Sequence, residues 1–171
     1  LNVKRNINIE GTIIVDTDIN VKRNINIDKY LNITQNANVE QNILVKKDII
    51  VDEDITVKRN INVDKNILVK NNVNIDKYLH VKENINVDKN ILVTNDINID
   101  QNLNVKRNIN VEGTIIVDTD INVKRNINID KYLNIKENAN VEENILVKKD
   151  IIVDEDITVK RNINVDKNIL V

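Results

Sequence analysis

The chain has 171 residues, with 25 Lys and Arg against 27 Asp and Glu, and it contains no cysteine, proline, methionine or tryptophan. These numbers exclude a disulfide scaffold and cysteine-ligated metal sites, and the nearly balanced charge argues against nucleic-acid binding. No apolar run approaches the roughly 20 residues that a membrane span needs, so we expect none.

A six-residue repeat runs through the chain from its first residue. Counted from Leu1, the sequence divides into 28 hexads and a final three-residue unit, without insertion or deletion. The first position is Ile, Leu, Val or Ala, and the third is Val or Ile, in all 29 units. This alternation is the two-residue period of a strand, whereas on a helix the apolar pairs would spread around all sides. We predict a short strand at the start of every unit, from 1–3 to 169–171, each followed by a polar bend.

The fourth position of the hexad predicts how many strands make one coil. It is charged in 26 of 28 hexads, and its sign alternates almost throughout. Neighbouring coils lie about 4.8 Å apart, where like charges repel. Three hexads per coil bring together 16 opposite-sign and 5 like-sign neighbours, whereas two hexads bring together 4 and 18. We predict an all-β, single-stranded, three-sided parallel β-solenoid with 18 residues per coil and 9.5 coils, in which Val63 lies between Val45 and Val81.

The sixth position suggests how the bends are made. Asn ends 16 hexads and Asp ends seven, and these residues accept positive φ angles more readily than other non-glycine residues. We therefore expect left-handed residues at the bends, with glycine taking this role at Gly11 and Gly113. The same argument predicts strain or a shifted turn at the three hexads that end in tyrosine: Tyr30, Tyr78 and Tyr132.

The segments 73–78 and 79–84, with the tandem Ile-Asn-Val-Asp-Lys-Asn units, resemble the hexapeptide-repeat family of left-handed triangular β-helices. The resemblance covers the whole chain. Four residues match the family's inward, corner and bend positions in order: Ile61, Val63, Asp64 and Asn66. The resemblance implies left-handed coiling, ahead of the right-handed alternative.

Many members of that family are acyltransferases with a catalytic histidine and loops that interrupt the coils. This chain has one histidine, His80, and no interrupting loop, so we do not carry the activity over. Stacked carboxylates such as Glu10 and Asp28 could share a calcium ion, but they lack a ligand-rich loop. We expect no catalytic residue, cofactor or metal.

The two ends of the sequence are near-copies. Residues 1–69 and 103–171 are identical at 65 of 69 positions, and segment 70–102 shows no linker, so we expect a single domain over 1–171. The offset of 102 residues is 17 hexads, which turns the second copy by one face of the rod. As a result, one edge is acidic near the N-terminus and basic near the C-terminus.

This arrangement predicts lateral association of rods, either staggered or antiparallel. The candidate contacts are charged bend residues and outward aliphatic residues, namely Lys4, Arg5, Lys58, Arg59, Asp52, Asp54, Lys124, Arg125, Lys160 and Arg161, and Ile50, Leu68, Ile152 and Leu170.

We therefore expect a structural, non-catalytic rod that forms part of a fibre or filament, whose partner is the chain itself, end to end or side by side. We expect no nucleic-acid partner and no small-molecule substrate. A surface-displaying or adhesin-like binding rod is the alternative, and a hexapeptide-repeat acyltransferase is the third hypothesis. The compartment is open, with an extracellular or particle-surface location favoured over the cytoplasm.

Overall fold

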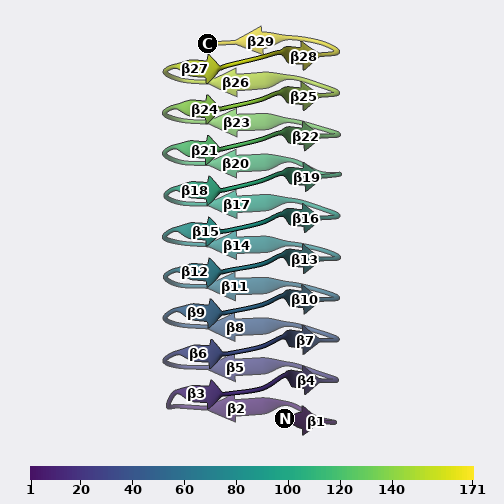
Figure 1. The fold of residues 1–171 in the computed structure, drawn as a ribbon, viewed down its shortest axis with the longest axis vertical. Coiled ribbons are helices and arrows are strands. Elements are labelled where there is room, and N and C mark those ends of the chain that lie inside the picture. Colours follow the sequence, from purple (N-terminus) through teal and green to yellow (C-terminus); the bar gives the residue numbers. More distant parts are fainter.

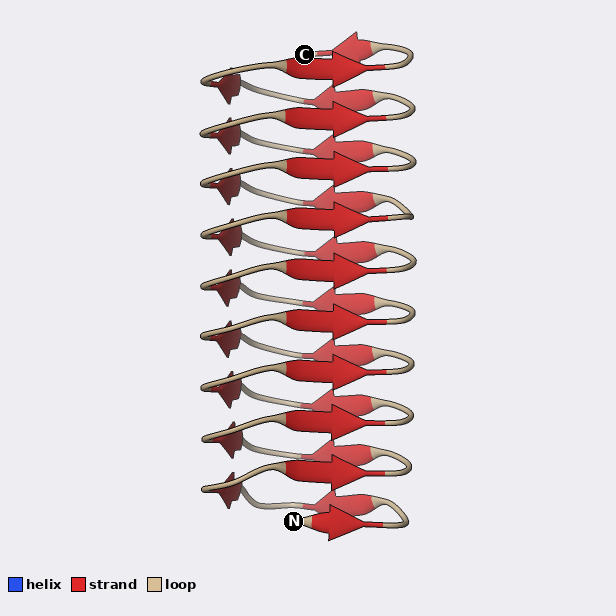
Figure 2. Ribbon diagram, turned by 45° about the vertical axis from the view of Figure 1, so that its right-hand side comes forward, coloured by secondary structure: helices blue, strands red, loops and turns tan.

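The computed structural model describes residues 1–171, which form one straight rod of stacked coils (Figure 1). Every hexad begins with a strand and continues through a bend, and three successive strands complete one coil. Figure 2 shows the same three sides repeated from the first coil to the last. The structure confirms the predicted all-β fold, the three parallel sheets and the 18-residue coil.

The three sheets contain every third strand, and we call them sheets A, B and C. Sheet A contains β1 (Asn2–Val3), β4 (Ile19–Val21), β7 (Ala37–Val39), β10 (Ile55–Val57), β13 (Val73–Ile75), β16 (Ile91–Val93), β19 (Ile109–Val111), β22 (Ile127–Ile129), β25 (Ile145–Val147) and β28 (Ile163–Val165). Sheet B contains β2 (Ile7–Ile9), β5 (Ile25–Ile27), β8 (Ile43–Val45), β11 (Ile61–Val63), β14 (Leu79–Val81), β17 (Ile97–Ile99), β20 (Ile115–Val117), β23 (Leu133–Ile135), β26 (Ile151–Val153) and β29 (Ile169–Leu170). Sheet C contains β3 (Ile13–Val15), β6 (Leu31–Ile33), β9 (Ile49–Val51), β12 (Ile67–Val69), β15 (Ile85–Val87), β18 (Leu103–Val105), β21 (Ile121–Val123), β24 (Ala139–Val141) and β27 (Ile157–Val159). The bend that follows a strand of each sheet lies at corner A, B or C, respectively.

Stacking places residues 18 apart directly over one another. Val63 pairs with Val45 on one side and with Val81 on the other, which confirms the predicted register. A three-residue strand makes too few contacts to be stable alone. The strands are stable here because each inner strand pairs with a parallel neighbour on both sides.

The lumen of the rod is entirely apolar. It is filled by 48 buried aliphatic side chains from the first and third positions, and no polar or charged residue is buried. Each fully buried large aliphatic contributes about 1.5–3 kcal/mol, so the lumen is the main source of stability. The predicted inward residues that stay exposed, such as Leu1 and Val171, lie in the first and last coils, where a coil has a neighbour on one side only.

The bends do not use positive φ angles, so that prediction was wrong. No residue, glycine or otherwise, has positive φ. The sixth-position Asn and Asp instead form ladders between coils: Asn84 donates its backbone N–H to Oδ1 of Asn66 at 3.1 Å, and its side-chain amide to the same oxygen at 3.2 Å. Asparagine recurs there because its side chain can accept from the coil above and donate to the coil below.

The tyrosine hexads show no shifted turn, because their strands and bends fall at the same positions as in the other hexads, and Tyr30, Tyr78 and Tyr132 keep φ negative like their neighbours. The ring of Tyr30 lies 5.3 Å from Nζ of Lys47, and the ring of Tyr132 lies 5.1 Å from Nζ of Lys149. These are cation–π distances.

Candidate interaction surfaces

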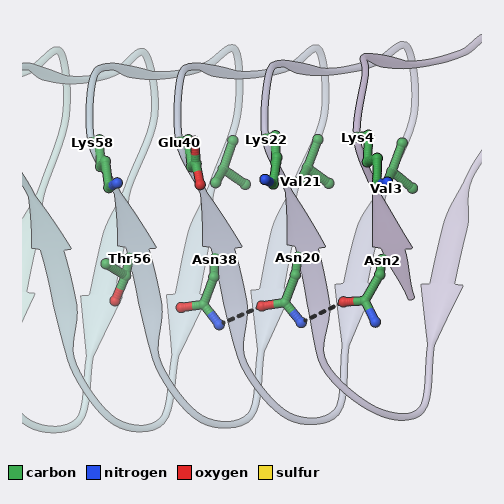
Figure 3. Close-up of a pocket in the computed structure, with 11 residues that line it drawn as sticks. Asn2, Val3, Lys4, Asn20, Val21, Lys22, Asn38, Glu40, Thr56 and Lys58 are labelled. Atoms are coloured by element: carbon green, nitrogen blue, oxygen red, sulfur yellow. Dashed lines mark hydrogen bonds between the residues drawn. The ribbon is translucent and has the colours of Figure 1, made fainter.

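A shallow groove, lined mostly by polar and charged residues, runs along sheet A in the first half of the rod (Figure 3). Its floor is a row of second-position side chains in which the amide of Asn38 donates to Asn20 at 3.0 Å and the amide of Asn20 donates to Asn2 at 3.1 Å. Fourth-position side chains form its rim, and the groove encloses about 510 Å³. The rim residues are Lys4, Lys22, Glu40 and Lys58.

The same groove recurs on sheet C in the second half of the rod. There Asn140 donates to Asn122 and Asn122 donates to Asn104, each at 3.1 Å. Two smaller hollows of about 230 and 190 Å³ lie along this row, lined in part by Lys124 and Lys160. The copies thus occupy adjacent faces, as the offset of 17 hexads requires.

Ion pairs run along the corners from coil to coil. Seven of the eight join fourth-position residues 18 apart, and in each of these the lysine lies one coil after the carboxylate, as in Lys82–Asp64 at 2.7 Å and Lys46–Asp28 at 2.9 Å. The hydrogen bond from Lys82 to Asp64, together with the charge of Asp64, raises the pKa of the lysine. Asp28 acts in the same way on the pKa of Lys46.

Two strips that contain aliphatic side chains interrupt the second-position rows of asparagine. The first, which begins at Ile14 on sheet C, is called strip C. The second, which begins at the equivalent residue of the second copy, Ile116 on sheet B, is called strip B. Ile14 and Leu170 are the most exposed aliphatic residues of the strips, at 71% and 63%. In each strip an isoleucine, an asparagine, an isoleucine and a leucine follow one another at intervals of 18 residues: Ile14, Asn32, Ile50 and Leu68 in strip C, and Ile116, Asn134, Ile152 and Leu170 in strip B.

The asparagine inside each strip has an unsatisfied acceptor. Oδ1 of Asn32 and Oδ1 of Asn134 are buried and lack a hydrogen-bond donor. Elsewhere in these rows the residue one coil later is often another asparagine, which donates its amide. Here the next residue is Ile50 or Ile152, which has no donor. An isoleucine at this place therefore costs the rod a hydrogen bond.

Corner C is the charged edge that the duplication predicts. It begins with acidic bends, which include Asp16 and residues 52–54, and continues with basic bends, which include Arg107, Arg125 and Arg161. Sixth-position residues form an unbroken ladder along it: the backbone N–H of each donates to the side-chain oxygen one coil before, from Asn36–Asp18 to Asn162–Asn144.

The predicted assembly residues do not form one surface. Corner C brings together Asp52, Asp54, Lys124, Arg125, Lys160 and Arg161, corner A carries Lys4, Arg5, Lys58 and Arg59, and the aliphatic residues Ile50, Leu68, Ile152 and Leu170 lie within the two strips. Sequence reasoning missed the asparagine ladders, although the recurrence of Asn at intervals of 18 residues was a signal that could have revealed them.

The remaining candidate residues lie apart from one another. His80 is on the outer face of sheet B between Asn62 and Asn98. The carboxylate of Asp28 pairs with Lys46 at 2.9 Å. No group of three or more His, Asp or Glu side chains is placed to hold a metal ion, and no helix long and apolar enough to cross a membrane is present.

Comparison with known proteins adds no relative. No protein-family model, curated protein or solved structure matches the chain. The class of protein is therefore defined by its own geometry, as a three-sided parallel β-solenoid built of 18-residue coils.

Proposed function

We propose that this chain is a structural, non-catalytic rod that associates with further copies of itself in a fibre or filament. The single observation that carries the proposal is the pair of apolar strips on the outer faces. Each strip exposes aliphatic side chains that add nothing to the lumen. Strip C leaves the acceptor of Asn32 unsatisfied, and strip B leaves two acceptors unsatisfied, those of Asn134 and of Asn98, which precedes Ile116.

The strips lower the stability of the isolated rod. A buried acceptor without a donor costs about 1–3 kcal/mol, and an exposed isoleucine gains little from folding. An asparagine in the place of Ile50 would remove both disadvantages, as it does on most of the surface. A strip that is costly in the isolated rod is understandable if a second rod covers it, because exposed aliphatic strips are typical of protein–protein contacts.

The stacking of like repeats supports a second mode of association. Each inner strand pairs in parallel with the coil before it and the coil after it, as β11 does with β8 and β14. A coil of a second copy can pair in the same way. We propose that end-to-end addition extends the rod while the strips join rods side by side.

The alternative function is a surface-displaying or adhesin-like binding rod, favoured by the groove that occurs once in each copy. An acyltransferase of the hexapeptide-repeat type is the third proposal, for which His80 is the one histidine. Membership of that family and left-handed coiling both stay predictions of the resemblance, whereas crossovers in ordinary parallel sheets are right-handed.

The test replaces Ile50 and Ile152 by asparagine. We expect Ile50→Asn/Ile152→Asn to raise the free energy of unfolding by about 1 kcal/mol or more, because each new amide can donate to Oδ1 of the asparagine before it. The same variant should associate less, measured by sedimentation velocity over a concentration series and by electron microscopy of the rods.

Thr56→Asn is the matched control. Thr56 follows Asn38 in the row of sheet A, so this substitution lengthens a ladder without removing an aliphatic side chain. It should leave association unchanged. If the strip variant associates as strongly as the original chain, the strips do not join rods and the proposal fails.

A further inference from the structure

We infer that a second copy of this chain binds antiparallel along corner C, with the two-fold axis at the coil of Asp88 and Lys89. The inference rests on the proposed self-association and specifies one edge, one orientation and one register for it. It follows from the order of charges along the nine bends of corner C.

The bends of corner C change from acidic to basic along the rod. The first carries Asp16 and Asp18, and the third carries Asp52, Glu53 and Asp54. The sixth, seventh and ninth each carry a Lys-Arg pair, beginning at residues 106, 124 and 160, and the eighth carries Glu142 and Glu143. The fifth, which holds Asp88 and Lys89, is neutral and central. Such an edge can pair with the same edge of a second copy that runs in the opposite direction, because acidic bends then face basic bends.

A two-fold axis at the fifth bend brings opposite charges together. It places Asp16 and Asp18 opposite the Lys-Arg pair of the ninth bend of the second copy. The acidic residues 52–54 then face the Lys-Arg pair of the seventh bend. The single like-charged contact is between Lys70 and the sixth bend, while Glu142 and Glu143 face the uncharged bend 34–36. Each contact occurs twice in the dimer because the interface is isologous.

The two registers half a coil away lose this match. If the axis moves half a coil toward the C-terminus, residues 52–54 face Glu142 and Glu143. If it moves half a coil toward the N-terminus, Asp16 and Asp18 face the same two glutamates. Like charges in contact disfavour both registers.

A parallel, staggered arrangement is also less favourable. It matches acidic with basic bends when one rod is displaced by six coils, where three of the nine bends are in contact, or by four coils, where five are in contact. Such a contact is also heterologous and adds chains without closing. The antiparallel pair uses the whole edge and closes as a dimer.

Corner C is suited to this contact by its rigidity and its unpaired charges. The unbroken ladder from Asp18 to Asn162 fixes the spacing of the bends. Several charged residues of the edge take part in no intrachain ion pair, among them Asp16, Glu53, Arg125 and Arg161. Exposed ion pairs are individually weak, so pairing depends on their number and on low salt, where unscreened attraction extends over more than about 10 Å.

The first experiment is a crosslink at the axis. The chain has no cysteine, so Lys89→Cys introduces a single thiol that meets its symmetry mate in the antiparallel dimer. Treatment with a short bis-maleimide at low salt should give covalent dimers. Lys77→Cys, at the equivalent bend position of corner A, is the matched control and should remain uncrosslinked. Equal crosslinking of the two variants, or none at residue 89, overturns the inference.

The second experiment reverses charges outside the intrachain pairs. Asp16→Lys/Glu53→Lys and Arg125→Glu/Arg161→Glu should each weaken dimerisation at low salt by about tenfold or more. An equimolar mixture should recover part of it, because the reversed residues face one another in the mixed dimer. No recovery on mixing overturns the pairing.

These outcomes separate the orientation from the proposed function. If the original chain associates through its strips while Lys89→Cys gives no crosslinked dimer, self-association stands and the antiparallel edge contact is wrong. If the original chain shows no association at any concentration or salt, both are wrong.

Discussion

At the scale of the residue, the sixth-position asparagines act between coils. Asn126 accepts the backbone N–H of Asn144 at 3.2 Å and its side-chain amide at 2.9 Å, while its own amide donates to Asn108 at 3.3 Å. Each asparagine thus serves the coil before it and the coil after it. Loss of one side chain breaks both connections.

We therefore expect Asn126→Ala to lower the free energy of unfolding by about 1–3 kcal/mol, because the N–H of Asn144 loses its acceptor. Asn162→Ala provides the comparison, since Asn162 ends the ladder and its side chain receives no N–H from a later coil. Its cost should be within about 0.5 kcal/mol. Urea unfolding of the two variants measures the difference, and equal costs would contradict a role for the ladder.

The two glycines differ in what surrounds them, although they are equivalent in sequence. A Cβ on Gly113 would collide with the backbone carbonyl of Asn95 and the carboxylate of Asp96 in the coil beneath, whereas a Cβ on Gly11 would meet only a methyl group of Ile9 at 3.7 Å. Glycine is needed at residue 113 for close approach of the backbone, not for its φ angle.

Gly113→Ala should therefore destabilise the rod by about 1–3 kcal/mol through overpacking. Gly11→Ala should be nearly neutral, and it can stabilise the chain slightly by restricting the unfolded state. Thermal unfolding of both variants checks the prediction, which fails if the two substitutions have the same effect.

At the scale of the element, the strand and its bend are joined to the next coil by an ion pair. The pKa is raised for Lys82 and Lys46 as described, for Lys136 by its hydrogen bond to Asp118, and for Lys148 by its hydrogen bond to Asp130. The backbone N–H of Asn36 lowers the pKa of Asp18. All five groups are exposed, so each contribution is small.

The directions of these shifts predict the dependence of stability on pH. A raised lysine pKa gives stability that is present below the ordinary lysine pKa of about 10.4 and is lost as the pH rises above it. The lowered pKa of Asp18 gives stability that is present above the ordinary aspartate value of about 3.9 and is lost as the pH falls below it. The midpoint of thermal unfolding should thus be nearly constant near neutrality and fall on both sides.

Salt provides the control for this prediction. At 1 M salt, where charges are screened beyond about 3 Å, the alkaline fall should become smaller because the lysine–carboxylate attraction is screened. An alkaline fall of the same size at low and high salt would show that the ion pairs along the corners do not cause it.

At the scale of the whole molecule, the relation between the two copies depends on the length of the segment between them. Deletion of 73–90 removes one full coil, so it keeps the acidic and basic bends on corner C. Deletion of 79–90 removes two strands and turns the second copy, which moves its basic bends to corner A. Both deletions keep the six-residue repeat, and a solenoid tolerates the loss of whole units because each coil contacts only its neighbours.

We expect both shortened chains to fold, with similar circular dichroism spectra. The chain without 73–90 should still dimerise at low salt, whereas the chain without 79–90 should not, because its acidic and basic bends then lie on different edges. Sedimentation equilibrium measures this. Dimerisation of both chains would show that the pairing does not use corner C.

The sequence by itself determined the strands, the 18-residue coil, the apolar lumen and the rotation of one copy against the other. These features follow from a strict period and from the signs of charges that stack. The tertiary structure alone decided how the bends are built, what Asn126 and Gly113 contact, and why Ile50 leaves Asn32 without a donor. The physical reason is that each of these partners lies about 18 residues away in sequence, in an adjacent coil. Local propensity alone favoured a positive φ angle at the bends. The hydrogen bonds between adjacent coils explain instead why asparagine occupies the sixth position.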